Sequence, residues 1–374
     1  MIIAVNTRSL PGWHLKGNAD HIYEIFGRLT TKHPEHEFIF IFDRPFDERS
    51  IKVKNVKGII VGAAATNPLR WKLWYDISIP AALRKHKADV FVTGDGICSL
   101  RTKLPQCLII SNVAFLQPLS LIKRSHLFFY KKYTAKFLEK ATSVATVSAF
   151  SKNDIIDHYK IAPEKIDIIY AGANKIFQPC SQEENMATKN SFTEGREYFL
   201  YAGEIAPQKN LVKLLKAFSI LKKRQKTNMK LVLSGKVADK YGSFVKDLDS
   251  YKFRDDVVIT GHLEEKELAK LMAAAYGFVY PSLYEGFAIP VLEAMQSGIP
   301  VITSAGSSMQ EITKGVALYA DANDHTDIAD KMMLLYKDEN LRNRLSIEGK
   351  SVANEYSWDR TADLLWQSIL KAIG

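Results

Sequence analysis

Short apolar runs alternate with segments of helical spacing along the first half of the chain. The runs are rich in Val, Ile and Phe, which is typical of buried strands. The segments between them, for example 21–32 and 127–140, repeat apolar residues at helical spacing. Alternating strands and helices predict a parallel sheet with helices on both faces. The strands are expected at residues 2–5, 37–42, 56–61, 90–93, 107–111, 143–147 and 166–170.

A polar stretch, 179–196, interrupts this alternation and is predicted to be a linker because it is poor in apolar residues. The alternation then restarts and runs almost to the end of the chain. Strands are expected at 198–202, 230–234, 257–260, 277–280, 301–304 and 317–319. Helices are expected at 210–223, 265–275, 291–297, 327–337, 339–351 and 358–373.

The predicted fold class is therefore α/β, with two tandem doubly wound, Rossmann-like domains facing a cleft. The first domain is expected to span 1–178 and the second 197–356, and the helix at 358–374 is expected to pack back on the first domain. In such sheets ligands bind beyond the carboxyl ends of the strands. The cleft between the two domains is thus the expected place for chemistry.

Residues 285–293 (EGFAIPVLE) combine two carboxylates with a helix start that suits an anion. Pro290 fits the first position of a helix, where a missing N–H costs nothing, and Gly286 lets a ligand approach the backbone. The N–H groups of residues 287–289 should then point outward and favour a diphosphate. Glu285 and Glu293 flank this site and could accept hydrogen bonds from sugar hydroxyls. The plain alternative is a solvated loop Glu285 and a Glu293 placed by the helix dipole.

This stretch resembles the Glu-x7-Glu signature of retaining GT-B glycosyltransferases, specifically glycosyltransferase family 4, also called glycosyl transferases group 1. Four other stretches agree with the family pattern: YAGEIAPQKNL at 201–211, LVLSGK at 231–236, VVITGHL at 257–263 and ATVSAFSK at 145–152. The resemblance implies a GT-B fold and an enzyme of the hexosyltransferase type that transfers a sugar with retention and without a metal. No Asp-x-Asp motif suited to a metal is apparent, and no cofactor is expected besides a UDP- or GDP-linked sugar donor.

The family pattern also implies roles for individual residues. Glu285 would contact the donor sugar, Lys209 would neutralise the diphosphate, and Glu293 would bind the ribose hydroxyls. Lys209 follows a glycine-containing turn and precedes a helix, so a fixed cation at the sheet edge is physically reasonable. The other residues expected at the donor are Gly203, Gly235, Lys236, His262, Leu263, Gly286, Phe287, Ala288 and Ile289.

The chain departs from the family pattern at two places. Many members carry Arg at the position of Glu204, so one expected diphosphate cation is missing. Where many members have His-Asp in the first domain, the best match here is Ser111-Asn112, and Asn112 is the candidate to contact the donor sugar. Gly17, just before a predicted helix, is expected to face the diphosphate and the acceptor. In the mechanism usually proposed for the family, the leaving phosphate oxygen takes the acceptor's proton, so no base in the first domain is required. For the missing Arg, either Lys209 acts with the helix N–H groups alone or Lys236 helps.

The charge of the chain is uneven, and this bears on its partners. The net charge is +10, and residues 51–140 hold 16 basic and 4 acidic residues. Residues 119–140 combine basic and aromatic side chains, which indicates either contact with an anionic membrane surface or a core helix with a solvated basic rim. No recognised nucleic-acid module is apparent, so nucleic acid is not an expected partner. Four scattered histidines have no metal-like spacing: His14, His21, His126 and His262.

The sequence therefore predicts a glycosyltransferase that moves a sugar from a nucleotide sugar to a glycan or lipid-linked acceptor, in surface polysaccharide or glycolipid synthesis. It is expected in the cytoplasm or peripheral on the inner face of the membrane, because no apolar run approaches the roughly 20 residues of a membrane helix. Two alternatives stay open: a non-catalytic nucleotide-sugar binding module and a GT-B nucleotide-sugar epimerase.

Overall fold

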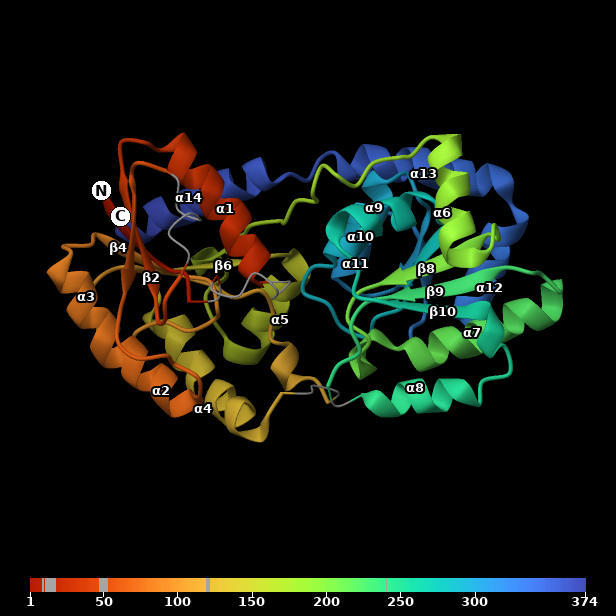
Figure 1. Cartoon of the computed structure of the whole chain (residues 1–374). Coiled ribbons are helices and arrows are strands. Elements are labelled where there is room, and N and C mark those ends of the chain that lie inside the picture. The colour runs from red at the N-terminus through yellow and green to blue at the C-terminus, as the bar shows by residue number, and fades with distance from the viewer. Residues whose placement is uncertain (9, 11–17, 47–52, 119–121, 240) are drawn as a thin grey trace. The chain divides into compact units, whose positions relative to one another are not determined.

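The computed structural model describes residues 1–8, 10, 18–46, 53–118, 122–239 and 241–374 of the 374-residue chain. The chain forms two compact units (Figure 1). Unit 1 comprises residues 1–171 and 357–374, and unit 2 comprises residues 172–356.

Unit 1 is built on a seven-stranded parallel sheet with the order β3-β2-β1-β4-β5-β6-β7. In Figure 1, helices α1 and α14 lie on one side of this sheet and α2, α3 and α4 on the other. The strands are β1 (Ile2–Asn6), β2 (Glu37–Phe42), β3 (Val56–Ile60), β4 (Val90–Thr93), β5 (Gln106–Ile109), β6 (Ser143–Thr146) and β7 (Ile166–Ile168). The helices are α1 (Asn18–Lys32), α2 (Pro68–Leu73), α3 (Ile79–Lys85), α4 (Arg124–Lys140), α5 (Ala149–Tyr159) and α14 (Trp358–Ile373), with a π-helical turn at Trp74–Ser78 and 3-10 turns at Ala114–Leu116 and Pro163–Lys165.

Unit 2 is built on a six-stranded parallel sheet with the order β10-β9-β8-β11-β12-β13. Helices α6, α9, α10 and α13 lie on one side of it and α7 and α8 on the other (Figure 1). The strands are β8 (Tyr198–Ala202), β9 (Lys230–Ser234), β10 (Val257–Gly261), β11 (Gly277–Tyr280), β12 (Val301–Ser304) and β13 (Leu318–Ala320). The helices are α6 (Gln182–Thr193), α7 (Leu211–Gln225), α8 (Gly242–Asp249), α9 (Glu265–Ala273), α10 (Ile289–Gln296), α11 (Ser308–Thr313), α12 (His325–Lys337) and α13 (Glu339–Ala353), with 3-10 turns at Pro207–Lys209 and Arg254–Asp256.

Both sheets are doubly wound, and this confirms the predicted fold class. The inner strands are buried on both faces, as in β8 and β9, where all five residues of each strand are buried. Strands buried on both sides read as continuous apolar runs, which is why the sequence pattern located them well. In each sheet the strand order reverses once, between β1 and β4 in unit 1 and between β8 and β11 in unit 2.

The stretch predicted as a linker, 179–196, differs from that prediction because most of it folds as helix α6. Ser181 and Glu184 form a reciprocal capping box at its start, and α6 packs on α9 within unit 2. The helix is polar because most of its residues face solvent, although Thr188 and Thr193 are buried. Low apolar content therefore marked a surface helix here and not a linker.

Helix α14 returns to unit 1 after the chain has completed unit 2. It begins where the Ser357 hydroxyl accepts the backbone N–H of Arg360, and its apolar face packs on α1 and on strands β4 to β7. Lys32 of α1 forms an ion pair with Asp363 of α14 at 2.7 Å. Unit 1 is thus built from two segments that are far apart in the chain.

The fully buried Leu365 of α14 should contribute strongly to the stability of unit 1. Leu365→Ala is expected to destabilise the protein by about 3 kcal/mol, since it removes buried methyl groups and leaves a cavity. Leu370→Ala on the same helix is the matched control, because Leu370 is exposed, and its cost should stay within about 0.5 kcal/mol. Urea unfolding measures both, and equal costs would contradict the packing described for α14.

Candidate active site

The strand-order reversal in unit 2 brings two loops together. One loop follows β8 and leads to Lys209, and the other follows β11 and leads to Glu285. Because β8 and β11 are adjacent and parallel, both loops leave the same edge of the sheet. Ligands of doubly wound sheets bind at this kind of position. The leading candidate residues of the sequence therefore meet where the fold favours a ligand.

The Lys209 ammonium and the Glu285 carboxylate form an ion pair, with both side chains 14% exposed. Lys209 Nζ also donates to the Tyr280 hydroxyl at 3.0 Å. Glu285 Oε1 accepts from Lys209, from the Ser282 hydroxyl at 2.7 Å and from the Tyr280 hydroxyl at 3.2 Å. All three contacts meet at Oε1, and among the hydrogen bonds of the described residues none reaches Oε2.

The electrostatics of this pair keep Lys209 charged. Burial alone would lower the pKa of the Lys209 ammonium, but the Glu285 carboxylate and its hydrogen bond outweigh burial, so the pKa is raised. The pKa of Tyr280 is also raised, first by burial and then by the charges of Glu285, Glu293 and Glu204. Tyr280 therefore stays protonated and serves as a neutral hydrogen-bond partner. Its ring stacks on Tyr201 with the centroids 5.5 Å apart.

The loop that carries Lys209 is fixed by its neighbours. Asn210 adopts the left-handed conformation (φ 62°), which Asn tolerates better than most residues. Its amide donates to Pro281 O at 3.1 Å and to Ala322 O at 2.7 Å. Leu283 N donates to Gln208 O at 2.9 Å and so joins the two loops directly. These bonds hold Lys209 and Glu285 in place independently of any ligand.

Helix α10 begins at Ile289, with Ala288 as its cap. The sequence suggested that Pro290 takes the first helical position, but it occupies the second. Glu293 is the fifth residue of the helix. The Glu293 charge contributes to the raised pKa of Tyr280, so it acts on the same site as Glu285. The backbone of Glu285 is held by Ser308, whose hydroxyl donates to Glu285 O at 2.7 Å. Gly286 and Ala288 are buried at this helix start, and Phe287 is partly buried against Tyr356.

Glycines at the carboxyl ends of β8 and β9 explain two further candidates. Gly203 and Gly235 have φ values of 148° and 147°, which side chains disfavour. A Cβ on Gly235 would lie 1.8 Å from Gly203 O, so only glycine fits between these strand ends. The carboxyl ends of β8 and β9 thus approach each other backbone to backbone.

The remaining donor candidates lie at the end of β9 and β10. The exposed Lys236 faces Asp239 at 3.8 Å, and no contact of the described residues joins it to the Lys209–Glu285 pair. His262 is exposed and Leu263 is partly buried directly after β10. Glu204 is exposed and its backbone carbonyl accepts the Tyr201 hydroxyl at 2.7 Å.

The two candidates from the first domain are Asn112 and Gly17. Asn112 follows β5 and uses its side-chain oxygen to accept Ala114 N at 2.9 Å, which shapes the turn at Ala114–Leu116. Ser111 lines a small pocket together with Gly94 and Thr361. Gly17 lies outside the described residues.

Unit 1 holds an ion pair at its own strand-order reversal that the sequence analysis missed. Arg8 follows β1, Asp95 follows β4, and their side chains meet at 2.7 Å at the strand-order reversal of unit 1. The Tyr75 hydroxyl donates to Asp95 Oδ1 at 2.6 Å, and the Arg8 guanidinium lies 5.3 Å from the ring centre of Trp71. Arg8 and Asp95 are separated by 87 positions, so only the predicted pairing of β1 with β4 could have suggested the contact.

Comparisons with known proteins identify the family of the chain. Residues 182–352 match the family described as glycosyl transferases group 1, and residues 17–175 match glycosyltransferase family 4. The O-antigen chain mannosyltransferase RfbU of Salmonella typhimurium is 30% identical over 75% of this chain and 75% of its own. The O-antigen chain mannosyltransferase B of Escherichia coli is 29% identical over 62% of this chain, and the match spans only 61% of that relative's length.

A solved structure of similar fold is the sucrose-phosphate synthase of Thermosynechococcus elongatus, with a TM-score of 0.79 over 98% of each chain and 16% identity. At that identity the likeness establishes the fold, which is GT-B. The protein is thus of the GT-B glycosyltransferase class. The chain belongs to glycosyltransferase family 4, and this confirms the resemblance found in the sequence.

The Lys209–Glu285 pair should contribute to the free energy of unfolding of unit 2. Lys209→Met is expected to cost about 3 kcal/mol because it leaves the Glu285 carboxylate partly buried without a cation. Adding Glu285→Gln should recover part of that loss, which urea unfolding in a double-mutant cycle measures. The cost should be constant from pH 6 to 9. It should shrink only above about pH 10.4, the ordinary lysine pKa, since the folded pKa is raised.

Lys216→Met is the control for this cycle, because Lys216 is an exposed lysine of the neighbouring helix α7. It should change the unfolding free energy by less than about 0.5 kcal/mol. Additive effects of the Lys209 and Glu285 changes would contradict the coupling described here.

Proposed function

We propose that the protein transfers a sugar from a nucleotide sugar to a glycan or lipid-linked acceptor with retention of configuration and without a metal ion. The observation that carries the proposal is the pinned Lys209–Glu285 pair at the strand-order reversal of unit 2. Membership of the family supports the reaction type.

Glu285 is suited to bind the donor sugar. Its Oε1 atom is engaged by Lys209, Ser282 and Tyr280, which fixes the orientation of the carboxylate. In the proposal, Oε2 accepts a hydroxyl of the donor sugar. A carboxylate held by three donors needs no reorganisation when that hydroxyl arrives, which favours a defined sugar pose.

Lys209 is suited to stabilise the leaving diphosphate. An ammonium has three N–H donors, and Glu285 and Tyr280 take two of them. In the proposal, the third donates to the diphosphate, whose charge grows as the glycosidic bond breaks. The leaving phosphate oxygen takes the acceptor's proton, so the step needs neither a side-chain base nor a metal. In the proposal, the N–H groups at the start of α10 and the backbone at Gly203 and Gly235 complete the diphosphate site.

The relatives guide the choice of substrates. Two of them are named O-antigen chain mannosyltransferases, so we propose a UDP- or GDP-linked mannose as the donor and a surface-polysaccharide precursor as the acceptor. A non-catalytic binding module would keep donor binding but show no transfer. An epimerase would release an altered sugar without an acceptor.

Glu285→Gln is expected to reduce the rate of sugar transfer by about 100-fold or more. The affinity for the nucleotide diphosphate should stay within about threefold of wild type. The reason is that the amide keeps the shape of the side chain but loses the charge that holds the donor sugar. The donor is first chosen by thermal shift with matched UDP and GDP sugars, where a ligand at 100 times its Kd adds about 2.7 kcal/mol of stability. Transfer and calorimetric UDP or GDP binding are then measured side by side.

Glu348→Gln is the control, because Glu348 is an exposed residue of helix α13. It should leave both measurements unchanged. Equal loss of transfer and of nucleotide binding in Glu285→Gln would refute the sugar-contact role, and donor binding without transfer to any acceptor pool would favour the binding module. Full transfer activity in EDTA and a product of retained anomeric configuration by NMR test the remaining parts of the proposal.

Helix α4 supports a second part of the proposal, contact with an anionic membrane surface. No helix among the described residues is long and apolar enough to cross a membrane. One face of α4 is core, with Phe129 and Phe137 buried. The other face exposes Lys131, Lys132 and the 67% exposed Phe128, with Lys132 Nζ lying 5.6 Å from the Phe128 ring centre. Cations around an exposed aromatic ring suit a headgroup layer.

The double change Lys131→Ala/Lys132→Ala should weaken binding to vesicles rich in anionic lipid by about thirtyfold at low salt, at about 1 kcal/mol for each lysine. Vesicle sedimentation measures the effect. The matched change Lys223→Ala/Arg224→Ala, which removes two exposed cations of α7, should have little effect. Failure of the wild-type protein to sediment with such vesicles would contradict the proposed membrane contact.

A further inference from the structure

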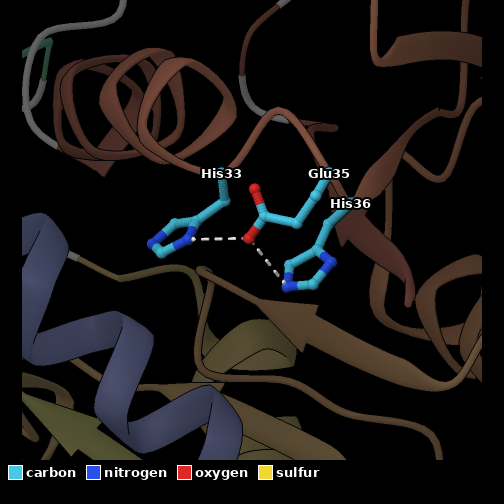
Figure 2. A group of neighbouring side chains, drawn as sticks. All are labelled: His33, Glu35 and His36. Carbon is cyan, nitrogen blue, oxygen red and sulfur yellow. Dashed lines mark ion pairs between the residues drawn. The ribbon is translucent and has the colours of Figure 1, made fainter.

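Three side chains converge where α1 ends and β2 begins: His33, Glu35 and His36 (Figure 2). Glu35 Oε1 lies 3.5 Å from His33 Nδ1 and 3.4 Å from His36 Nε2. Figure 2 shows the carboxylate between the two imidazole rings. The side chains of His33 and His36 are only 20% and 17% exposed, whereas Glu35 is 57% exposed. The cluster is thus half set into unit 1 and open on one side.

The backbone that carries these residues is held by a single side chain. Asn55 Nδ2 donates to Thr30 O at 3.0 Å, to His33 O at 3.1 Å and to His36 O at 2.9 Å. The amide therefore bridges the carbonyls of both histidines. Pro34 lies between His33 and Glu35 and restricts the turn further. The backbone that carries the two histidines is thus fixed before any ligand binds.

The rings are also fixed by an aromatic neighbour. His33 stacks on Trp366 of helix α14 with the centroids 3.8 Å apart, and His36 lies 5.2 Å from the same ring. The two imidazoles are nearly parallel, at 12°, so Trp366 sets the orientation of both. Side chains locked in this way lose little entropy when they coordinate an ion.

The spacing fits a small tetrahedral cation. Zinc bonds to His nitrogen and carboxylate oxygen at about 2.0–2.2 Å, so the edge of its coordination tetrahedron is about 3.4 Å. The two measured nitrogen–oxygen separations have this length, and all three ligand atoms lie within 4.8 Å of one another. Two imidazoles and one carboxylate are also the ligands that divalent zinc, nickel and copper accept.

We propose that His33, Glu35 and His36 bind one divalent transition-metal ion of the zinc type, with the fourth position open to water. The plain alternative is a hydrogen-bonded His–Glu–His group with no ion. The site lies at the amino end of β2, whereas ligands of doubly wound sheets bind at the carboxyl ends. The ion would fasten the turn between α1 and β2 beside α14, and it takes no part in sugar transfer. The proposal therefore stands independently of the proposed function.

Zinc titration by calorimetry into the full chain, free of any polyhistidine tag and stripped with EDTA, tests the proposal. One zinc ion per chain is expected. Each of His33→Gln, Glu35→Gln and His36→Gln should weaken binding by about tenfold or more, since each removes a ligand. Circular dichroism confirms that each variant is folded. His158→Gln is the matched control, because His158 pairs with Asp154 at 3.0 Å but belongs to no three-ligand group among the described residues.

Trp366 provides a second test, because a cluster that binds no ion would leave the tryptophan fluorescence unchanged during a metal titration. Copper or nickel bound next to an indole quenches its fluorescence, so titration should quench part of the tryptophan emission with one ion bound. That part should vanish in Trp366→Phe and in His36→Gln. Absence of saturable zinc binding, or binding equal to wild type in all three ligand variants, would overturn the proposal.

Discussion

The pairing of Lys209 with Glu285 is the interaction on which the candidate site depends. It places one cation and one anion at the point of the unit 2 sheet where the strand order reverses. Each charge offsets part of the desolvation penalty of the other. The neutral Tyr280 and Ser282 complete the hydrogen bonding. A ligand that carries both a diphosphate and hydroxyl groups can engage both members of such a pair.

Much of the fold and of the candidate site in unit 2 was predictable from the sequence because both depend on local patterns. Strands buried on both faces give continuous apolar runs, and the carboxyl ends of adjacent strands must meet at one edge. This placed Lys209 and Glu285 together. Helix α6 was not predicted, because a short polar helix has no apolar stripe to distinguish it from a linker. Helix α10 begins at Ile289, two residues before the expected range 291–297, which is the usual uncertainty at a helix end.

The features that the sequence did not reveal are those made by distant segments. Arg8 and Asp95 meet only because β1 and β4 are neighbours in the sheet. His33 and His36 were passed over because their short spacing resembles an ordinary turn, and only Asn55 and Trp366 show that the turn is fixed. Both units thus carry an ion pair at the reversal of strand order, one with arginine and one with lysine.

The return of α14 to unit 1 has a consequence for how the chain folds as it is made. Residues 1–171 emerge from the ribosome first, but the helix that covers strands β4 to β7 is encoded after residue 356. Unit 2 is continuous in sequence and can complete its core earlier. The nascent first unit must therefore keep part of its sheet uncovered during synthesis of unit 2. The order of completion is the reverse of the order of the units along the chain.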